Sequence, residues 1–205
     1  MTHEDILKDW SVSRETLARL TIFEKTILKW NPKINLVSKN SLGDLWTRHI
    51  VDSIQVFRSI SPGKMWVDIG SGGGFPGLIV AILAADETPE TLVTLIESDQ
   101  RKAAFLRTAA RECGIKVNVI NERIEKVDEQ SADVLSARAL ADLDQLLEFS
   151  ERHLLPEGTA LFPKGVTWKK ELESAQQKWC FDVDPITSLT EPNAVILKIR
   201  GVTRV

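Results

Sequence analysis

Three glycines at alternate positions follow a short apolar run near residue 70. The stretch reads Asp68-Ile69-Gly70-Ser71-Gly72-Gly73-Gly74-Phe75-Pro76-Gly77. Gly70, Gly72 and Gly74 permit a tight turn with positive φ and let a ligand lie against bare backbone. A turn that follows a strand and opens a helix is typical of a cofactor site in an open α/β sheet. Taken alone, the glycine pattern also fits a dinucleotide fingerprint.

The acidic residues around this turn favour one class of cofactor. Asp68 lies two residues before the first glycine, where a bound pyrophosphate would gain nothing from an extra anion. A carboxylate does attract the sulfonium and α-amino groups of S-adenosylmethionine, directly or through water. Glu97 ends the next apolar run and is placed to accept hydrogen bonds from ribose hydroxyls in either cofactor class. The sequence therefore predicts S-adenosylmethionine rather than a nicotinamide dinucleotide.

Strand and helix patterns alternate after the turn. The apolar runs expected to form strands cover 65–69, 91–96, 117–120, 133–137 and 159–162. The helical patterns between and after them cover 77–85, 99–112, 142–153 and 167–179, and Pro156-Glu157-Gly158 is expected to be a turn. Two last strands, near 181–183 and 194–199, are joined by a short link and predict a hairpin. We predict an α/β fold with a doubly wound, Rossmann-like class I methyltransferase sheet, mostly parallel with an antiparallel edge.

The first sixty residues have a helical pattern and are expected to cap the sheet. Ser13 is the expected N-cap of a first helix that ends at Asn31-Pro32. Its expected apolar face consists of Leu17, Leu20, Phe23, Ile27 and Leu28. A second helix can start at Ser41. Because Ser61-Pro62-Gly63 closes this region, we expect a helical extension over 1–61 and one compact methyltransferase domain over 62–205.

Composition excludes several classes of protein. The chain has 205 residues, of which 43% are hydrophobic and 27% charged, so it is not disordered or fibrous. A net charge of −3 argues against binding nucleic acid by overall charge alone. Two cysteines cannot by themselves make a zinc site or a disulfide framework, and no metal site is predicted. The N-terminus lacks a secretory pattern, and the longest apolar run is too short to span a bilayer, so we expect a cytoplasmic protein without a membrane partner.

Five motifs in order resemble one known family. They are Trp30-Asn31-Pro32-Lys33-Ile34-Asn35-Leu36, Arg48-His49-Ile50-Val51-Asp52-Ser53, the 68–77 turn, Glu97-Ser98 with Lys102 and Phe105-Leu106, and Ser136-Ala137-Arg138-Ala139. The combination, from roughly Trp30 to Lys164, resembles the RsmG (glucose-inhibited division protein B) family of bacterial 16S rRNA guanine-N7 methyltransferases. The resemblance implies methyl transfer from S-adenosylmethionine to N7 of a guanine in the 530 loop of 16S rRNA, guanine-527 in standard rRNA numbering. It implies 16S rRNA or the small ribosomal subunit as the partner, and we expect a monomer.

The resemblance also implies cofactor contacts. It assigns this role to Gly70 and Phe75 in the turn, to the Ile124-Glu125 pair after the third strand, and to Arg138 after the fourth. With the residues argued above, the predicted cofactor-binding set is Asp68, Gly70, Gly72, Gly74, Phe75, Glu97, Ile124, Glu125 and Arg138.

Methylation of guanine N7 sets modest chemical demands. N7 carries an in-plane lone pair and no proton, so the reaction needs an in-line approach to the methyl group and no general base. Arg138 and Arg123, which follow strand ends on the cofactor side, are the predicted catalytic residues and act by positioning. Arg48, His49 and Lys164 are candidate RNA contacts. The alternatives are a packed histidine and cations paired with carboxylates.

Motifs of other methyl transfers are missing. Amine methylation usually has an Asn/Asp-Pro-Pro-aromatic turn after the fourth strand, where this chain has Ser136-Ala137-Arg138-Ala139. Methylation of pyrimidine C5 needs a nucleophilic cysteine, and both Cys113 and Cys180 are expected to be structural thiols. Two other function classes remain open: a methyltransferase acting on a small molecule or a protein, and a nicotinamide-dependent oxidoreductase, which Asp68 opposes.

Overall fold

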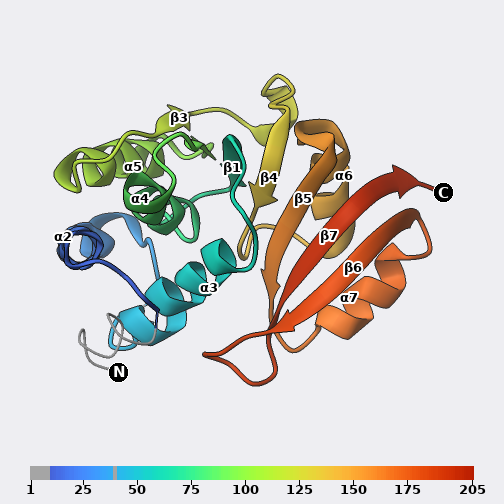
Figure 1. The fold of residues 1–205 in the computed structure, drawn as a ribbon, viewed down its shortest axis with the longest axis horizontal. Coiled ribbons are helices and arrows are strands. Elements are labelled where there is room, and N and C mark those ends of the chain that lie inside the picture. The colour runs from blue at the N-terminus through green and yellow to red at the C-terminus, as the bar shows by residue number, and fades with distance from the viewer. Residues whose placement is uncertain (1–9, 39–40) are drawn as a thin grey trace.

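A seven-stranded sheet forms the centre of the molecule (Figure 1). The computed structural model describes residues 10–38 and 41–205. The strands are β1 (Met65–Ile69), β2 (Leu92–Ile96), β3 (Asn118–Ile120), β4 (Ala132–Ser136), β5 (Leu154–Lys164), β6 (Trp179–Thr187) and β7 (Val195–Arg204), in the order β3-β2-β1-β4-β5-β7-β6. Strands β1 to β5 pair in parallel, whereas β7 is antiparallel to β5 and to β6. The predicted fold, a mostly parallel sheet with an antiparallel edge, is confirmed.

Helices cover both faces of the sheet. They are α2 (Arg14–Ile34), the π-helix η2 (Trp46–Val51), α3 (Asp52–Arg58), α4 (Gly77–Glu87), α5 (Gln100–Glu112), the short 3-10 helix η3 (Ile124–Lys126), α6 (Leu143–His153) and α7 (Trp168–Ala175). Successive strand residues face opposite layers. In β1, Trp66 packs with residues of α2 to α5, and Val67 packs with residues of α6 and α7. One core therefore joins the N-terminal helices to the sheet, and a domain boundary near residue 61 stays a prediction.

The topology reverses between β1 and β4, the two central strands. Asp68 of β1 lies in register with Ser136 of β4 and with Leu95 of β2. Residues that follow these three strands therefore meet at the carboxyl edge of the sheet, where open α/β sheets bind ligands.

Helix α2 begins after Ser13, as predicted, and extends beyond its predicted end at Asn31-Pro32. Ser13 Oγ accepts from the Thr16 backbone N–H at 3.0 Å, as an N-cap does. The helix continues through Pro32 to Ile34, and Pro32 has no N–H to donate to the carbonyl of Leu28. Leu28, predicted on the apolar face, is 48% exposed.

Two further predictions are wrong in detail. The second helix begins with η2 at Trp46, not at Ser41, and residues 39–40 lie outside the described part of the chain. The predicted turn at 156–158 lies within β5, where the six residues from Leu154 to Thr159 oppose the three residues from Ala132 to Val134 of β4 and form a bulge.

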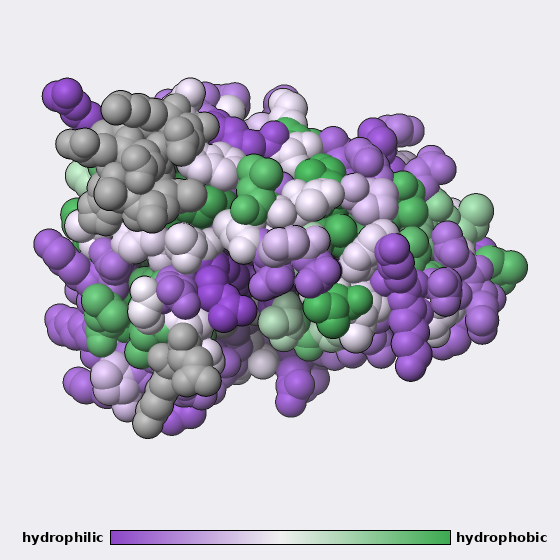
Figure 2. All heavy atoms as spheres, turned by 90° about the horizontal axis from the view of Figure 1, so that it is seen from below, coloured by the Kyte–Doolittle hydropathy of each residue, from purple (hydrophilic) through white to green (hydrophobic). Residues whose placement is uncertain are grey.

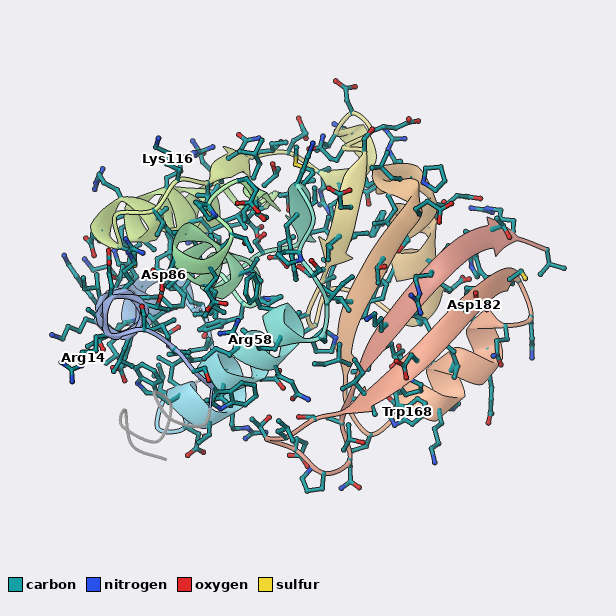
Figure 3. The ribbon with its side chains drawn as sticks, in the orientation of Figure 1. Arg14, Arg58, Asp86, Lys116, Trp168 and Asp182 are labelled. Atoms are coloured by element: carbon teal, nitrogen blue, oxygen red, sulfur yellow. The ribbon has the colours of Figure 1, made fainter. Side chains whose placement is uncertain are left out.

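Strand β6 and helix α7 lie at the end of the molecule opposite to α2, although the link between β6 and β7 contacts Gln55 of α3. Figure 3 shows Trp168 and Asp182 at the end of the molecule opposite to Arg14 and Lys116. Helix α7 ends at Ala175, earlier than predicted, because Trp179 already belongs to β6. No helix in the described ranges is long and apolar enough to cross a membrane.

Candidate functional site

The glycine turn has the backbone conformation predicted from its sequence. Gly70, Gly72 and Gly74 have φ angles of +63°, +50° and +85°. A Cβ on Gly72 would meet only the Gly70 carbonyl oxygen, at 3.6 Å, so the space beside it is open. A Cβ on Gly73 would lie 3.0 Å from the carbonyl oxygen of Leu36. The segment after α2 therefore covers one side of the turn, and Gly72 leaves the other side free for a ligand.

The motif around Asn31 explains how that covering segment is held. Asn31 is buried, and its Oδ1 accepts from the backbone N–H groups of Leu36 and Val37 at 2.7 and 2.9 Å. Asn35 adopts a left-handed conformation and ends α2. These bonds fix the chain at the position where Leu36 meets the turn.

Asp68 lies beneath the turn and not on its surface. It is 1% exposed, and Ser136 Oγ donates to its Oδ1 at 2.6 Å. Its Oδ2 faces the backbone of Gly77 at the start of α4. Burial raises the pKa of Asp68 to about 6, against the opposing effects of Ser136, Ser71 and the Arg138 charge. Asp68 therefore does not line the surface on which a ligand would lie.

Glu97 connects the turn to the next helix. It is 7% exposed, and its Oε2 accepts from the Gly72 N–H at 2.8 Å. Its Oε1 accepts from the N–H of Asp99, the N-cap of α5, also at 2.8 Å. Each carboxylate oxygen has a second lone pair, so a ribose hydroxyl can bind there as well.

A cavity of about 360 Å³ opens on the turn, and we call it the turn cavity. Among the residues that line it are the predicted Gly70, Gly72, Glu97, Arg123, Ile124 and Glu125. The segment from Arg123 to Glu125 enters η3, which brings the buried Ile124 and the exposed Glu125 to the wall. Lys102, Leu140, Gln145 and Phe149 also line it; the last three come from the segment after β4 and were not predicted.

Arg138 lies close to both Phe75 and Asp52. Its guanidinium is 5.0 Å from the ring centroid of Phe75, which is itself buried. Its Nη1 is 3.9 Å from Asp52 Oδ2. Burial lowers the pKa of Arg138, and the charges of Asp52 and Asp68 oppose this change, so the side chain stays a cation at neutral pH. Phe75 therefore supports Arg138 from below and does not line the turn cavity.

His49 is a packed residue. Its ring centroid is 5.1 Å from that of Phe75, and neither ring nitrogen has a hydrogen-bond partner among the residues described. Burial, with the charges of Arg138 and Arg48, lowers the pKa of His49 to about 4. The ring is therefore neutral at pH 7 and cannot attract a phosphate by charge.

A second cavity of about 380 Å³ adjoins the first, and we call it the hairpin cavity. Four separate segments line it, within 48–52, 138–141, 163–171 and 188–195, the last from the link between β6 and β7. Ala139 and Ala141 line both cavities. Seen from below the view of Figure 1, strongly hydrophilic side chains lie in a recess near the middle of the face (Figure 2).

The predicted RNA contacts Arg48 and Lys164 both line the hairpin cavity. Arg48 is exposed. Lys164 Nζ donates to Glu171 Oε2 at 2.7 Å and to the Ala141 carbonyl at 2.9 Å, so this lysine is paired as the alternative reading expected. Arg138, predicted as a cofactor contact, lines this cavity and not the turn cavity.

Sequence reasoning missed three polar residues of the site. Asp52 and Glu171 line the hairpin cavity, and Ser136 holds the carboxylate of Asp68. Asp52 and Ser136 stood within the quoted motifs, but no local pattern shows that a strand and a hairpin bring them to one edge. Burial raises the pKa of the Cys113 thiol to about 12, and Cys180 is exposed on β6; neither lines a cavity. Across 10–38 and 41–205, no group of three or more metal-ligating side chains is found.

Solved structures identify the class of fold. The chain resembles a TehB-like SAM-dependent methyltransferase from Corynebacterium glutamicum, with a TM-score of 0.60 and 13% identity over 89% of this chain and 99% of that one. It resembles MtNAS in complex with S-adenosylmethionine equally well, with a TM-score of 0.60 and 16% identity over 97% and 82% of the two chains. The fold is therefore the Rossmann-like methyltransferase fold that was predicted.

Sequence comparison gives the family. The pattern of rRNA small subunit methyltransferase G matches residues 16–196, and the chain belongs to this family. A ribosomal RNA small subunit methyltransferase G of Ruegeria pomeroyi is 68% identical over 195 residues, which are 95% of this chain and 96% of the relative. One from Cereibacter sphaeroides is 47% identical over the full length of both. The family predicted from the five motifs is confirmed.

Proposed function

We propose that this chain transfers the methyl group of S-adenosylmethionine to N7 of a guanine in the 530 loop of 16S rRNA, guanine-527 in standard rRNA numbering. Family membership supports methylation of small-subunit rRNA, and we expect this reaction to take place in the cytoplasm. One observation carries the choice of site: the turn cavity and the hairpin cavity share a wall at Ala139 and Ala141. S-adenosylmethionine bound in the turn cavity and the target guanine bound in the hairpin cavity would meet at that wall.

The residues of the turn cavity fit S-adenosylmethionine. The open space beside Gly72 accommodates a ligand against bare backbone, and the buried Asp68 carboxylate offers a negative charge beneath it. Glu97 is in place to accept from ribose hydroxyls, with Arg123, Ile124 and Glu125 along the wall. When bound, the cofactor supplies an electrophilic methyl group on a sulfonium, and the protein supplies its orientation.

Methylation of the second substrate, guanine, needs no general base from the protein. The lone pair of guanine N7 attacks without loss of a proton, so the side chains of the hairpin cavity have only to hold the ring in line with the methyl group. His49 and both thiols line neither cavity, which fits a reaction without a general base or a covalent enzyme intermediate. Arg138 and Arg123 act by positioning, and we expect the enzyme to work as a monomer.

The experiment uses small ribosomal subunits and naked 16S rRNA from a strain that lacks this methyltransferase. Methyl-labelled S-adenosylmethionine and the purified chain should label 16S rRNA. Methylation at N7 puts a fixed positive charge on the base, so reduction and mild aniline treatment should cut the labelled RNA at one guanine of the 530 loop. Labelled rRNA that resists this cleavage, or a label on a ribose or an adenine, would contradict the proposal. RNA that takes up no label at all would favour a small molecule or a protein as the substrate.

A further inference from the structure

A hydrogen-bond donor and an acceptor lie side by side in the hairpin cavity. Arg138 Nη1 and Asp52 Oδ2 are 3.9 Å apart, which is too long for a hydrogen bond between them. Both side chains are mostly buried, with 18% and 14% of their surface exposed. The two groups attract each other without bonding directly. Arg138 Nη1 also donates to the Arg48 carbonyl at 3.4 Å, but a guanidinium has five N–H donors, so Arg138 retains hydrogen-bonding capacity for a ligand in the cavity, as does Asp52 Oδ2.

The carboxylate of Asp52 is held in one orientation. Its Oδ1 accepts from Ser188 Oγ at 3.4 Å and from Thr190 Oγ1 at 3.3 Å. The link that carries these hydroxyls is fixed by Gln55, which donates to the Thr187 carbonyl at 2.7 Å and accepts from the Leu189 N–H at 3.0 Å. Oδ2 is therefore the oxygen left to face Arg138 and a ligand.

The other paired charges of this cavity are already engaged. Glu171 Oε2 accepts from Lys164 and from the Leu143 N–H, and Oε1 accepts from Thr167. Lys164 is bound to Glu171 and to a backbone carbonyl. Glu191 is exposed at the rim. Asp52 is thus the mostly buried acid of this cavity that still has a carboxylate oxygen available to a ligand.

We propose that Arg138 and Asp52 together read the Watson–Crick edge of the target guanine, with Arg138 donating to O6 and Asp52 accepting from N1–H. This inference rests on the proposed function. Guanine presents O6 and N1–H as neighbouring acceptor and donor, whereas adenine presents a donor at N6 and an acceptor at N1. The pair therefore selects guanine over adenine, because with adenine both contacts would be inverted. N7 is left uncontacted, so it can face the turn cavity across Ala139 and Ala141.

Base analogues at the target position test the pair in the unaltered protein. The substrates are small subunits reconstituted with 16S rRNA that carries guanine, inosine or 2-aminopurine at that one position. Inosine keeps O6 and N1–H and loses only the 2-amino group, so its kcat/KM should stay within about threefold of guanine's. 2-Aminopurine keeps N7 but lacks O6 and has an acceptor at N1, so its kcat/KM should fall by about a hundredfold or more.

Asp52→Asn tests the acceptor. The amide keeps the shape and an oxygen for Ser188 and Thr190, but places an NH₂ group where Oδ2 was. We expect kcat/KM for guanine to fall about ten- to hundredfold while that for 2-aminopurine is unchanged or rises, so the ratio between them drops at least tenfold. Affinity for S-adenosylhomocysteine should stay within about threefold. Glu191→Gln, an acid at the rim of the same cavity, is the matched control and should leave the ratio unchanged.

The outcomes separate the two proposals. If the unaltered protein does not methylate the guanine substrate, the proposed function fails and this inference fails with it. If it methylates guanine but D52N keeps the full guanine to 2-aminopurine ratio, the function stands and the reading role of Asp52 is wrong. If D52N does not fold, the analogue series decides: methylation of 2-aminopurine as fast as guanine overturns the pair.

Discussion

The two cavities at the carboxyl edge of the sheet are built in different ways. The turn cavity has the backbone of the glycine turn on one side, where Glu97 accepts from the Gly72 N–H, and residues within 96–102, 123–125 and 139–149 complete its lining. The hairpin cavity is made of side chains from four distant segments, which hold one another through contacts such as Lys164 with Glu171. The first cavity is inseparable from the fold, whereas the second can change its side chains while the fold persists. Substitutions at the glycine turn should therefore affect stability and cofactor binding, whereas substitutions in the hairpin cavity should affect the RNA substrate.

The largest expected effect comes from Gly77→Val, at the base of the turn. A Cβ at Gly77 would lie 2.5 Å from Leu95 Cδ2 and 2.6 Å from Asp68 Oδ2, both buried in the core. Overpacking there should lower the free energy of unfolding by about 3 kcal/mol or more, measured by chemical denaturation. Gly43→Val is the control, since a Cβ at Gly43 meets nothing within 4 Å. Equal stability of the two variants would show that the turn is not locked to the core.

Asp68 should make the stability of the ligand-free protein depend on pH. Its pKa rises from 3.8 in the unfolded chain to about 6 in the fold, so folding favours the protonated form. The stabilisation is fully present below about pH 4 and is lost as the pH rises through 6. The side chain at this position cannot ionise in the variant Asp68→Asn. The free energy of unfolding of this variant minus that of the original protein should therefore grow by about 2 kcal/mol between pH 4 and pH 7. A difference that stays flat over this range would mean that Asp68 is not a buried acid.

Glu97→Ala should weaken cofactor binding by removing the acceptor for Gly72 and Asp99. We expect about a ten- to hundredfold loss of affinity for S-adenosylhomocysteine by calorimetry, because the turn loses its fixed position and the ribose loses an acceptor. Glu90→Ala, at an exposed acid away from both cavities, is the control. Unchanged affinity in both variants would remove Glu97 from the cofactor site.

Arg48→Ala should have the smallest effect, and only on RNA. Arg48 is exposed at the rim of the hairpin cavity and does not line the turn cavity. One lost phosphate contact should lower affinity for 16S rRNA a few-fold and reduce the slope of log K against log salt concentration by about 1. Affinity for S-adenosylhomocysteine should not change, and a loss there would mean that the two cavities are not separate in function.

The same contrast explains what the sequence could predict. The turn, Asp68 and Glu97 were predictable because a cofactor loop is contiguous and its acids end strands of recognisable pattern. Asp52 and Glu171 could not be assigned to the site, because their positions depend on the packing of α3 and α7 and on the hairpin link. The π-helix that carries Arg48 and His49 has no signature in its residue types. In α2 the buried face includes the polar Thr26, which donates to Glu112 at 2.6 Å, and an apolar pattern could not show that Thr26 is buried while Leu28 is exposed.

The most direct test replaces one atom of the target base. In 7-deazaguanine a C–H group stands in place of N7, while O6, N1–H and the 2-amino group are retained. Small subunits carrying this base at the target position should bind the enzyme with unchanged affinity, accept no methyl group and inhibit methylation of normal subunits competitively. Methyl transfer to the 7-deaza substrate at the rate of the natural one would contradict N7 as the acceptor. A large loss of binding would contradict recognition through the Watson–Crick edge with N7 facing the methyl group.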